Sequence, residues 1–345
     1  MSRVFVRGWG AVSPAGWGAA PLVQALEAGV CLPTNELVRP GWERTLRVRG
    51  VPKPMARPAF LAHPRLRRSS PVAHYALAAA IEALGDDAAR VAAGAIRLGV
   101  VFCVMSGCVQ YSRRFFDEVL RDPSTASPLV FPETVFNAPA SHLSAFFGSS
   151  SENYTVVGDA TAFVHGLEIA AHWLGEGRVD GCLVVAAEEL DWLTADAFRH
   201  FSRSVTCAEG AGALYLVDSP ADTISVELDA VTDGVPLTGR MPVGDAIRLS
   251  AAGLSAAGDD ELLVDGLRGA ARLDQAEMAA WRDWHGARVS PKKILGEALT
   301  ASAAWQCVAA CESIASGKHS CARVSVVGPN AQAIAARFRA GQTIT

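Results

Sequence analysis

The chain has 345 residues, of which half are apolar and 19% are charged. This composition is too apolar for a disordered protein and sufficient for a large core, in one large domain or two fused halves. The formal net charge of −4 argues against nucleic acid as a partner, because phosphate binding requires a strongly basic face. The one dense basic run, "RLRR" at 65–68, is typical of a solvated turn and less often of a dock for an acidic partner.

The N-terminus, "MSRVFVRGWGAVSP", alternates like a strand and lacks the layout of a signal peptide. No uninterrupted apolar run reaches the roughly 18 to 20 residues of a membrane span, so we expect a cytoplasmic protein without one. Eight cysteines are spread along the chain without a CxxC pair. We therefore expect buried thiols rather than disulfides or a zinc ribbon.

Strands and helices alternate through the first 220 residues. A continuous apolar run with β-branched residues predicts a strand covered on both faces, and Ala/Leu-rich stretches predict helices. A serine at the start of the second helix predicts a side-chain cap. In chain order we expect a strand and turn over 3–16, helices over 20–29 and 69–87, a strand over 96–104, a helix over 112–122, a proline-broken loop over 123–139, a helix over 140–148, a strand, helix and strand within 155–190, and a turn and strand over 209–217.

The second half repeats this alternation more faintly. It predicts strands over 224–231 and 260–267, helices over 273–286 and 299–317, and a final strand over 321–328. Strands that alternate with helices predict a mainly parallel sheet covered by helices. "DSPADT" at 218–223 is the best boundary between the halves, which we place at 1–219 and 220–345.

Several stretches together resemble the β-ketoacyl synthase family of the thiolase superfamily. They are "VFVRGWGAVSPAG", "ASPLVFPETVFNAPASHLSAFFG", "EGAGALYL" and the faint glycine-loop trace "GPN" at 328–330, in the family's order. The resemblance covers nearly the whole chain, which is shorter than typical members. It implies a thiolase-like α/β fold with two similar βαβ-rich halves in an αβαβα arrangement.

In that family a cysteine at a helix N-terminus takes the acyl chain, since the helix dipole favours the thiolate, and two histidines stabilise the carbanion formed by decarboxylation. The nucleophile motif overlays "TVVGDATA", which puts Ala160 at the cysteine position. "GLRGAARLDQAE" puts Gly266 at the first histidine position, and "KKILGEALTASAAWQ" puts Glu297 at the second. The resemblance therefore implies no catalytic residues and no condensing activity for the isolated chain.

Degenerate members of this kind resemble chain-length factors, which pair with an active ketosynthase and shape its acyl tunnel. The implied function is a non-catalytic subunit of a polyketide, polyene or fatty-acid-type elongation system, without a cofactor. The implied partners are an active ketosynthase and an acyl carrier protein, reached directly or through that ketosynthase. The wording "SPLVFPETVFNAPASHLS" and "LVVAAEELDWLTADA" looks most like proteins of bacterial aryl-polyene pathways.

Two alternatives remain. One is an acyltransferase or thioesterase with a relocated nucleophile, Thr161 or Cys207, and the other is a homodimeric acyl-binding scaffold. Thr161 and Asp159 are more typical of helix caps, and Cys207 of a buried or partly buried thiol. Normal elongation by the ketosynthase alone would argue against the chain-length-factor hypothesis.

Other candidates each have a plainer interpretation. His165, Glu168 and His172 share one helix face, as metal ligands would, but a polar stripe is more common and we expect no metal. Cys307 and Cys311 look like small core residues. The tunnel or interface candidates are Phe136, Asn137, Phe146, Phe147, Thr161 and Phe163, and the arginines that could meet an acidic carrier protein are Arg65, Arg67, Arg68, Arg113 and Arg114.

Overall fold

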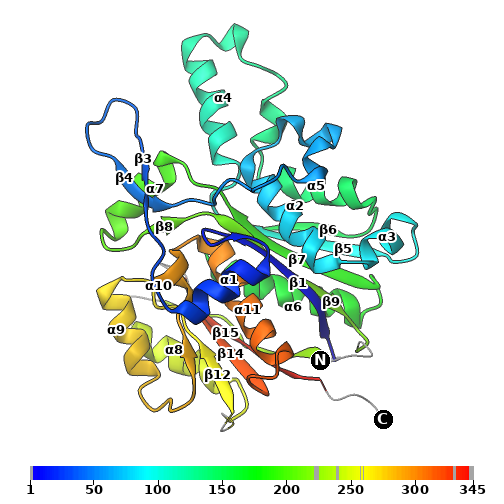
Figure 1. Cartoon of the computed structure of the whole chain (residues 1–345), viewed down its shortest axis with the longest axis vertical. Coiled ribbons are helices and arrows are strands. Elements are labelled where there is room, and N and C mark those ends of the chain that lie inside the picture. Colours follow the sequence, from blue (N-terminus) through cyan, green and yellow to red (C-terminus); the bar gives the residue numbers. More distant parts are fainter. Residues whose placement is uncertain are drawn as a thin grey trace.

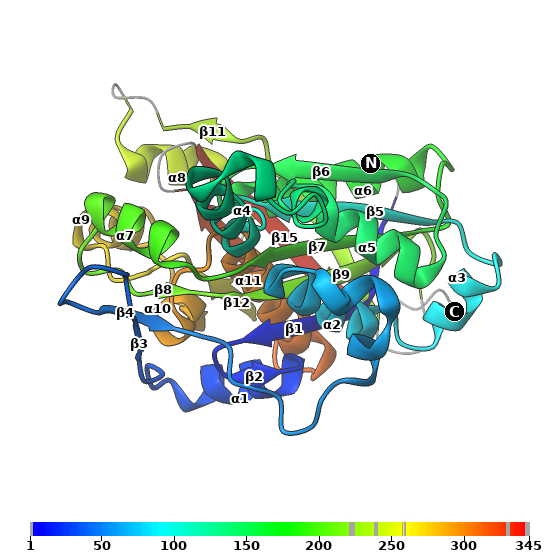
Figure 2. The same cartoon turned by 90° about the horizontal axis from the view of Figure 1, so that it is seen from above.

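The first half of the chain forms five strands in the order β6-β5-β7-β9-β1 (Figure 1). This computed structural model describes residues 3–220, 225–237, 241–256, 258, 260–328 and 332–341. In Figure 2, β1, β9, β7, β5 and β6 follow one another from the bottom to the top of the view. The strands are β1 (Phe5–Ser13), β5 (Leu98–Val104), β6 (Asn153–Val157), β7 (Gly181–Glu188) and β9 (Gly210–Val217), with the short β2 (Gly16–Trp17) paired to β1.

The second half repeats this order as β13-β12-β14-β15-β10. Each strand therefore has a counterpart at the same place in the other half, although the two halves share no visible sequence repeat. The strands are β10 (Val226–Val231), β12 (Glu261–Val264), β13 (Arg288–Val289), β14 (Cys321–Val327) and β15 (Gln332–Ala340), with the short β11 (Val235–Pro236) paired to β15.

The two halves join where β1 pairs antiparallel with β10, so one twelve-stranded sheet runs through the molecule. Its outer pairs are parallel, but β7, β9, β1, β10, β15 and β14 pair antiparallel in succession. The prediction of a mainly parallel sheet was wrong. It rested on strand–helix alternation, whereas β15 follows β14 with no helix between them. The helix between β7 and β9, α7 (Trp192–Phe201), packs on β4 (Leu46–Arg49) and does not cross the large sheet to a parallel position.

Helices complete a five-layered arrangement. α6 (Thr161–Gly175) and α11 (Leu299–Ala315) pack against each other and against strands of both halves. On the outer faces, α2 (Pro71–Leu84) and α5 (Ala138–Phe147) cover the first half, and α8 (Val243–Ala252), which packs on α9 (Ala271–Ala280), covers the second. The thiolase-like fold expected from the sequence is confirmed.

Strand β7 shows how the inner and outer cores divide. Cys182 and Val184 face the core around α6 and α11, whereas Leu183 and Val185 face the core under α2 and α5. All of its residues are buried, as expected for a strand covered on both faces. A glycine in α6, Gly166, lets that helix approach closely, because a β-carbon there would lie 2.9 Å from Cys103 Sγ.

Several elements escaped the sequence analysis. The structure continues past the expected final strand into β15, and it contains α7 (Trp192–Phe201) and α8. Ser70 does not cap α2, because its hydroxyl donates to the buried carboxylate of Glu189 (2.5 Å) instead. The remaining elements are α1 (Ala19–Ala28), α3 (Asp87–Ala92), α4 (Val109–Arg121), α10 (Pro291–Leu295), the small sheet β3 (Asn35–Leu37), β4 (Leu46–Arg49) and β8 (Cys207–Ala208), and 3-10 turns at Ala59–Ala62, Pro64–Arg68, Pro123–Thr125 and Phe131–Glu133.

The expectation of mostly buried thiols is confirmed. All eight cysteines are free thiols and five are buried, including Cys307 and Cys311. No helix among the described residues is long and apolar enough to cross a membrane. The boundary between 1–219 and 220–345 stays a prediction; it falls between the end of β9 and the start of β10.

Candidate functional site

The first candidate position lies where β6 turns into α6. Ala160 occupies the position just before the helix and is 1% exposed. Its neighbour Asp159 accepts hydrogen bonds from the backbone N–H of Thr161 (3.1 Å) and from the Thr161 hydroxyl (2.7 Å). A methyl group, which can neither attack nor transfer a proton, therefore stands at the helix N-terminus, beside a carboxylate that caps the first turn.

Strand β15 covers this helix start. The Gln332 side-chain amide donates to the Thr161 hydroxyl (3.0 Å) and lies 2.5 Å from His165 Nε2. A β-carbon on Gly328, just after β14, would lie 1.9 Å from the Asp159 carboxylate, so a side chain there would require Asp159 to move. The predicted glycine-loop trace begins here, but Pro329 and Asn330 lie outside the described residues.

The second candidate position lies at the start of α11. Glu297 is 3% exposed, and its carboxylate accepts a hydrogen bond from the N–H of Leu299 (2.9 Å). Its backbone forms a bridge to Cys207, and its carbonyl accepts from the N–H of Ala208 (2.9 Å). Leu299 has a φ of +49°, which is uncommon and strained for a residue with a side chain. The helix start is thus held in a special conformation with a carboxylate as its cap.

A buried charge cluster surrounds Glu297. Its Oε2 lies 3.2 Å from both Arg268 Nη1 and Lys292 Nζ, and each of these side chains is at most 2% exposed. Burial alone would raise the pKa of Glu297, but Lys292 and Arg268 hold it below its usual range. Burial, followed by repulsion from Arg268, lowers the pKa of Lys292. We call Arg268, Lys292 and Glu297 the charge cluster.

The third candidate position, Gly266, follows β12. Its N–H donates to the buried carboxylate of Glu277 (2.8 Å), which also accepts from the Ser325 hydroxyl (2.9 Å). Burial, and then the nearby Asp265, raise the pKa of Glu277 to about 7. A β-carbon on Gly266 would lie 3.1 Å from Glu277, so a large side chain would not fit without displacement.

The structure brings these three segments together. The Cys103 thiol at the end of β5 donates to the carbonyl of Ala162 (3.4 Å), and the Cys103 carbonyl accepts from the Thr300 hydroxyl (3.3 Å). One residue therefore contacts the first turns of both α6 and α11. Arg268, two residues after Gly266, donates to the carbonyl of Val327 next to Gly328. The segments around 160, 266 and 297 thus share one region between the two halves.

Sequence reasoning missed Arg268, Glu277 in its bonded role, and Gln332. Arg268 and Glu277 stand inside the stretch "GLRGAARLDQAE", where an arginine between two glycines after a buried strand was the available signal. No local sequence pattern indicated a role for Gln332, because its contact with Thr161 on α6 joins residues 171 positions apart.

The alternative nucleophiles are poorly placed for attack. The Thr161 hydroxyl does not cap α6, contrary to expectation, because it donates to Asp159 and accepts from Gln332. Burial, and then Glu297, raise the pKa of Cys207 to about 12, so this half-buried thiol stays protonated at neutral pH.

The histidine stripe of α6 does not assemble a metal site. His165 Nδ1 lies 3.6 Å from Glu168 Oε2, while His172 is exposed. The described part of the chain contains no group of three or more histidine, cysteine, aspartate or glutamate side chains placed to hold a metal ion.

The aromatic candidates separate into different surroundings. Phe163 and Phe147 are buried in the inner and outer cores respectively, whereas Phe136 is 43% exposed and Asn137 is exposed beside it. Phe146 is half-buried and contacts His63 edge to face, with ring centroids 5.5 Å apart. Only Phe163, which lies on α6, and Thr161 adjoin the region of Ala160.

The candidate arginines also divide. Arg113 pairs with Asp191 and Asp117, and Arg114 pairs with Glu118. Arg65, Arg67 and Arg68 are exposed and make no ion pair within the described residues. The first two arginines are electrostatically compensated, and the last three are available to an acidic group.

Solved structures with the same fold come from ketosynthase systems. "The ishigamide ketosynthase/chain length factor" has a TM-score of 0.79 at 22% identity over 99% of this chain and 100% of that chain. "Ketosynthase (ApeO) in complex with its chain length factor (ApeC)" from Xenorhabdus doucetiae has a TM-score of 0.80 at 14% identity over 99% and 98%. A ketosynthase and acyl-carrier protein complex, AntDE:AntF, has a TM-score of 0.79 at 16% identity over 99% of both chains.

Among curated proteins, none matches this chain. Residues 1–218, however, match the family described as "Beta-ketoacyl synthase, N-terminal domain". This stretch is more than half of the chain and holds β1 to β9, with the Ala160 turn between β6 and α6. The chain belongs to the β-ketoacyl synthase family.

Proposed function

We propose that this chain is a non-catalytic, chain-length-factor-like subunit that pairs with an active β-ketoacyl synthase. In this role it shapes the partner's acyl tunnel during polyketide, polyene or fatty-acid-type elongation. Its own positions for the cysteine and the two histidines are Ala160, Gly266 and Glu297. An acyl carrier protein delivers the chain, directly or through the partner, and the aryl-polyene type of pathway is the narrower form of the proposal.

The charge cluster is the observation that carries this proposal. A thioester site needs a thiolate and neutral hydrogen-bond donors, whereas the start of α11 presents a buried carboxylate with two cations. Because its pKa is held low, Glu297 is an ionised acceptor and cannot donate a hydrogen bond to a thioester carbonyl as a histidine does. Arg268 forms an ion pair with Glu297 and donates a hydrogen bond to the Val327 carbonyl, so it also occupies space between α11 and β14.

An exposed apolar face supports the pairing. β6 ends the strand order of the first half and bonds only to β5 among the described strands. Tyr154 and Val157 on β6 are 55% and 56% exposed, and α4 stands away from the body of the molecule at the top of Figure 1. We call the exposed apolar residues of this region the pairing face: Met105, Phe116, Leu120, Leu129, Phe131, Val135, Phe136, Tyr154 and Val157.

A concentration of exposed apolar residues in one part of the chain is typical of an interaction site on a folded protein. Of the described residues with large, exposed apolar side chains, more than half lie between Met105 and Val157. An unpaired edge strand also exposes N–H and C=O groups that another strand would satisfy. Phe136 on this face and the exposed Asn137 next to it are the candidates for lining a tunnel shared with the partner. The more buried candidates Phe146, Phe147, Thr161 and Phe163 would act from behind them.

The direct test is coexpression with an intact ketosynthase of an elongation system, followed by native mass spectrometry. We expect a 1:1 heterodimer and elongation only when both chains are present. The matched variant Tyr154→Lys/Val157→Lys places two charges on β6 without touching the core, and it should prevent pairing. Normal elongation by the ketosynthase alone would refute the proposal.

The alternative with a relocated nucleophile predicts a covalent intermediate. Incubation of the isolated chain with acyl-carrier thioesters should give no acyl adduct by intact mass, because Thr161 and Cys207 are bonded or protonated as described. The scaffold alternative predicts a homodimer in the absence of any ketosynthase. Solution mass measurements of the isolated chain separate it from an obligate heterodimer.

A further inference from the structure

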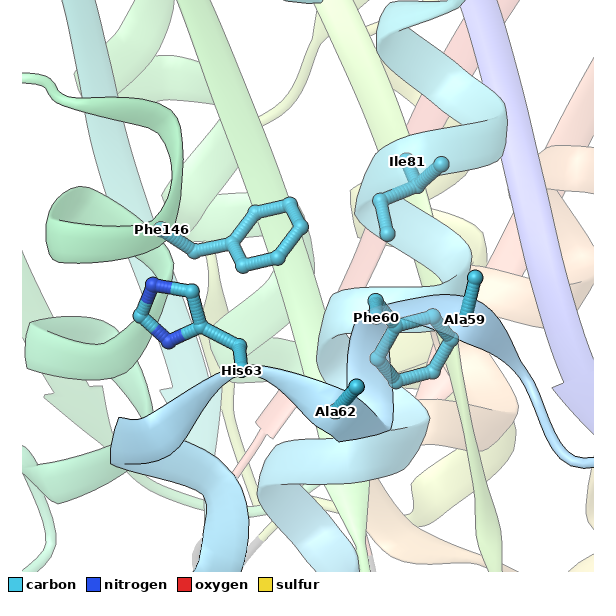
Figure 3. A pocket seen from close by; sticks show the side chains of 6 residues that line it. All are labelled: Ala59, Phe60, Ala62, His63, Ile81 and Phe146. Carbon is cyan, nitrogen blue, oxygen red and sulfur yellow. The ribbon is translucent and has the colours of Figure 1, made fainter.

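Two cavities in the first half of the chain differ in their chemistry. Figure 3 shows one on the outer helix layer, where Phe60, Ile81 and Phe146 surround an apolar space with no carboxylate in its lining. The other has a volume of about 520 Å³, within the range of ligand pockets, and lies beside the small sheet of β3 and β4. Glu209 lines this second cavity, which we call the acidic pocket. A carboxylate in the lining selects the charge of a ligand, whereas purely apolar walls do not.

The walls of the acidic pocket come from separate segments that hydrogen bonds hold together. The N–H of Gly50 donates to Asn35 Oδ1 (3.3 Å), and the Gln110 side chain donates to the Leu190 carbonyl (2.9 Å). Prolines restrict the backbone at further places in the lining. They are Pro14, Pro33 and Pro52. The space is therefore preformed by the fold.

Glu209 brings a negative charge to this space. It is 8% exposed, and its two carboxylate oxygens accept hydrogen bonds from the N–H groups of Val51 (3.1 Å) and Leu190 (2.9 Å). The Tyr75 hydroxyl, which also lines the pocket, bonds to the same carboxylate. The carboxylate of Glu189 is 2% exposed and close enough to repel that of Glu209. Two like charges are therefore buried together at the acidic pocket.

Neither carboxylate has a cationic side chain to balance it. Glu189 and Glu209 form no ion pair in the part of the chain that the structure describes, and the pocket lining contains no lysine, arginine or histidine. Burial raises the pKa of Glu189 to about 7 and also raises the pKa of Glu209. Buried charges in folded proteins are paired with an opposite charge or bind a cation. The missing partner of this pair is a positive charge.

We propose that the acidic pocket binds a small organic cation, an ammonium group carried on an apolar chain or ring. The ammonium lies next to the Glu209 carboxylate, and the apolar part contacts Leu190 and the prolines of the lining. This site goes beyond the proposed pairing, because its lining shares no residue with the pairing face or the charge cluster.

The lining selects this class of ligand over two others. An organic anion would be repelled by Glu209 and would meet no cation in the lining. A metal ion requires several ligating side chains, and the described residues hold no group of three or more histidine, cysteine, aspartate or glutamate side chains placed for one. An ammonium is a compact charge with hydrogen-bond donors only, which suits a carboxylate, and its apolar body suits the rest of the wall.

The test compares three ligands with the same six-carbon chain and different head groups: hexylamine, hexanol and hexanoate. Binding is measured by isothermal titration calorimetry at pH 8, where an alkylamine is protonated because its pKa resembles the value of about 10.4 for lysine. We expect hexylamine to bind about tenfold more tightly than hexanol, since hydrogen bonds to charged groups are the stronger ones, and hexanoate not to bind. Shortening the amine to pentylamine should weaken binding about fourfold for the methylene removed.

Two variants assign the binding to this pocket. Glu209→Gln keeps the size of the side chain and removes its charge, so it should weaken hexylamine binding about tenfold and change hexanol binding by less than about twofold. Pro33→Trp narrows the pocket from an exposed position and should weaken binding of both ligands about tenfold. The control Glu176→Gln removes an exposed charge outside the lining and should bind as the unchanged protein does.

Three results would overturn the proposal. The first is equal affinity of the unchanged protein for hexylamine and hexanol. The second is unchanged hexylamine binding by either variant with its fold verified by circular dichroism, and Pro33→Trp decides this alone if Glu209→Gln does not fold. The third is tighter binding of calcium chloride or of Nα-acetyl-lysine amide than of hexylamine, which would assign the carboxylates to a metal ion or to a partner's lysine. None of these measurements requires the ketosynthase, so failure here is separate from failure of the pairing.

Discussion

The starts of α6 and α11 occupy equivalent places in the two halves, and both are capped by a carboxylate two residues before the bonded amide. Asp159 bonds to the N–H of Thr161, and Glu297 bonds to the N–H of Leu299. At α6 the carboxylate's further partner is a neutral hydroxyl, and it makes no ion pair within the described residues. At α11 it has two buried cations.

Under the proposed function, the two helix starts lack a reactive group in different ways. Ala160 leaves only a methyl group at the start of α6. The charge cluster, in which Glu297 pairs with Lys292 and Arg268, occupies the start of α11. A methyl group at Ala160 costs little stability. The charge cluster, in contrast, is stable only when all three of its charged side chains are present.

The largest expected effect on stability comes from the charge cluster at the start of α11. Glu297→Gln leaves Arg268 and Lys292 buried next to each other without a counter-charge, which should lower the free energy of unfolding by about 3–5 kcal/mol. Urea unfolding at neutral pH measures it. The matched control Asp283→Asn removes one partner of an exposed pair, with both side chains at least 79% exposed, and should change it by less than about 0.5 kcal/mol.

Replacing the whole cluster separates the charges from the space that they fill. Arg268→Met/Lys292→Met/Glu297→Leu should recover most of the stability lost in Glu297→Gln, because the desolvation penalties disappear together with the attraction. A triple variant as unstable as the single one would mean that packing around Val327, rather than charge balance, holds this region.

The next effect concerns introduction of a histidine at 266, the position to which the resemblance assigns the family's first histidine. A β-carbon there would lie 3.1 Å from Glu277, so Gly266→His should cost about 1–3 kcal/mol through overpacking. We therefore expect Ala160→Cys/Gly266→His/Glu297→His to show no condensation with acyl and malonyl thioesters by intact mass. Ala160→Cys alone is the control for folding. Turnover by the triple variant would show that Arg268 and Glu277 do not obstruct the site.

The sequence predicted the frame of the site better than its interior. The turn at 158–163 and the helix after it are local, because β6, the capping Asp159 and the apolar period of α6 all lie within a few residues. The layered fold followed from the resemblance. The charge cluster could not be predicted from the sequence, since Arg268 and Glu297 come together only when β12 and α11 pack against each other.

The prediction of a mainly parallel sheet was wrong, and β15 was not predicted, for related physical reasons. β15 follows β14 almost immediately and pairs with it antiparallel, so no helix separates the two in the sequence. It contains Arg337 and Arg339, and charged residues of this kind predict an exposed segment rather than a strand of the sheet. In the structure the two arginines form ion pairs with carboxylates of neighbouring strands, Glu261, Glu227 and Asp229. A charge satisfied by a distant strand carries no local signal.

A smaller effect tests Glu277, the buried carboxylate on α9 that accepts from Gly266 and Ser325. Its pKa is about 7 in the folded chain, against an ordinary value of about 4.3, so the folded state holds the proton more tightly. This contribution makes the free energy of unfolding fall as pH rises from about 4.5 to 7. Glu277→Gln should remove that slope and be more stable at pH 7 by about 2 kcal/mol.

Urea unfolding at several pH values between these limits measures the difference between Glu277→Gln and the unchanged chain. The exposed Glu176 provides the control, because Glu176→Gln should follow the unchanged chain at every pH. A Glu277→Gln variant that runs parallel to the unchanged chain would mean that Glu277 is ionised throughout and that the nearby cations stabilise it.

The smallest expected effect on stability comes from Thr161 at the start of α6. Thr161→Val keeps the shape of the side chain but removes the hydroxyl that donates to Asp159 and accepts from Gln332, at a cost of about 1 kcal/mol. The hydroxyl proton already has a carboxylate partner, and Gln332 lies between Thr161 and His165. Acyl labelling should therefore be absent both before and after the substitution. An acyl adduct that Thr161→Val abolishes and Thr161→Ser retains would instead identify Thr161 as a nucleophile at the start of α6. The start of α11, with its charge cluster, would then be the only one of the two helix starts without a nucleophile.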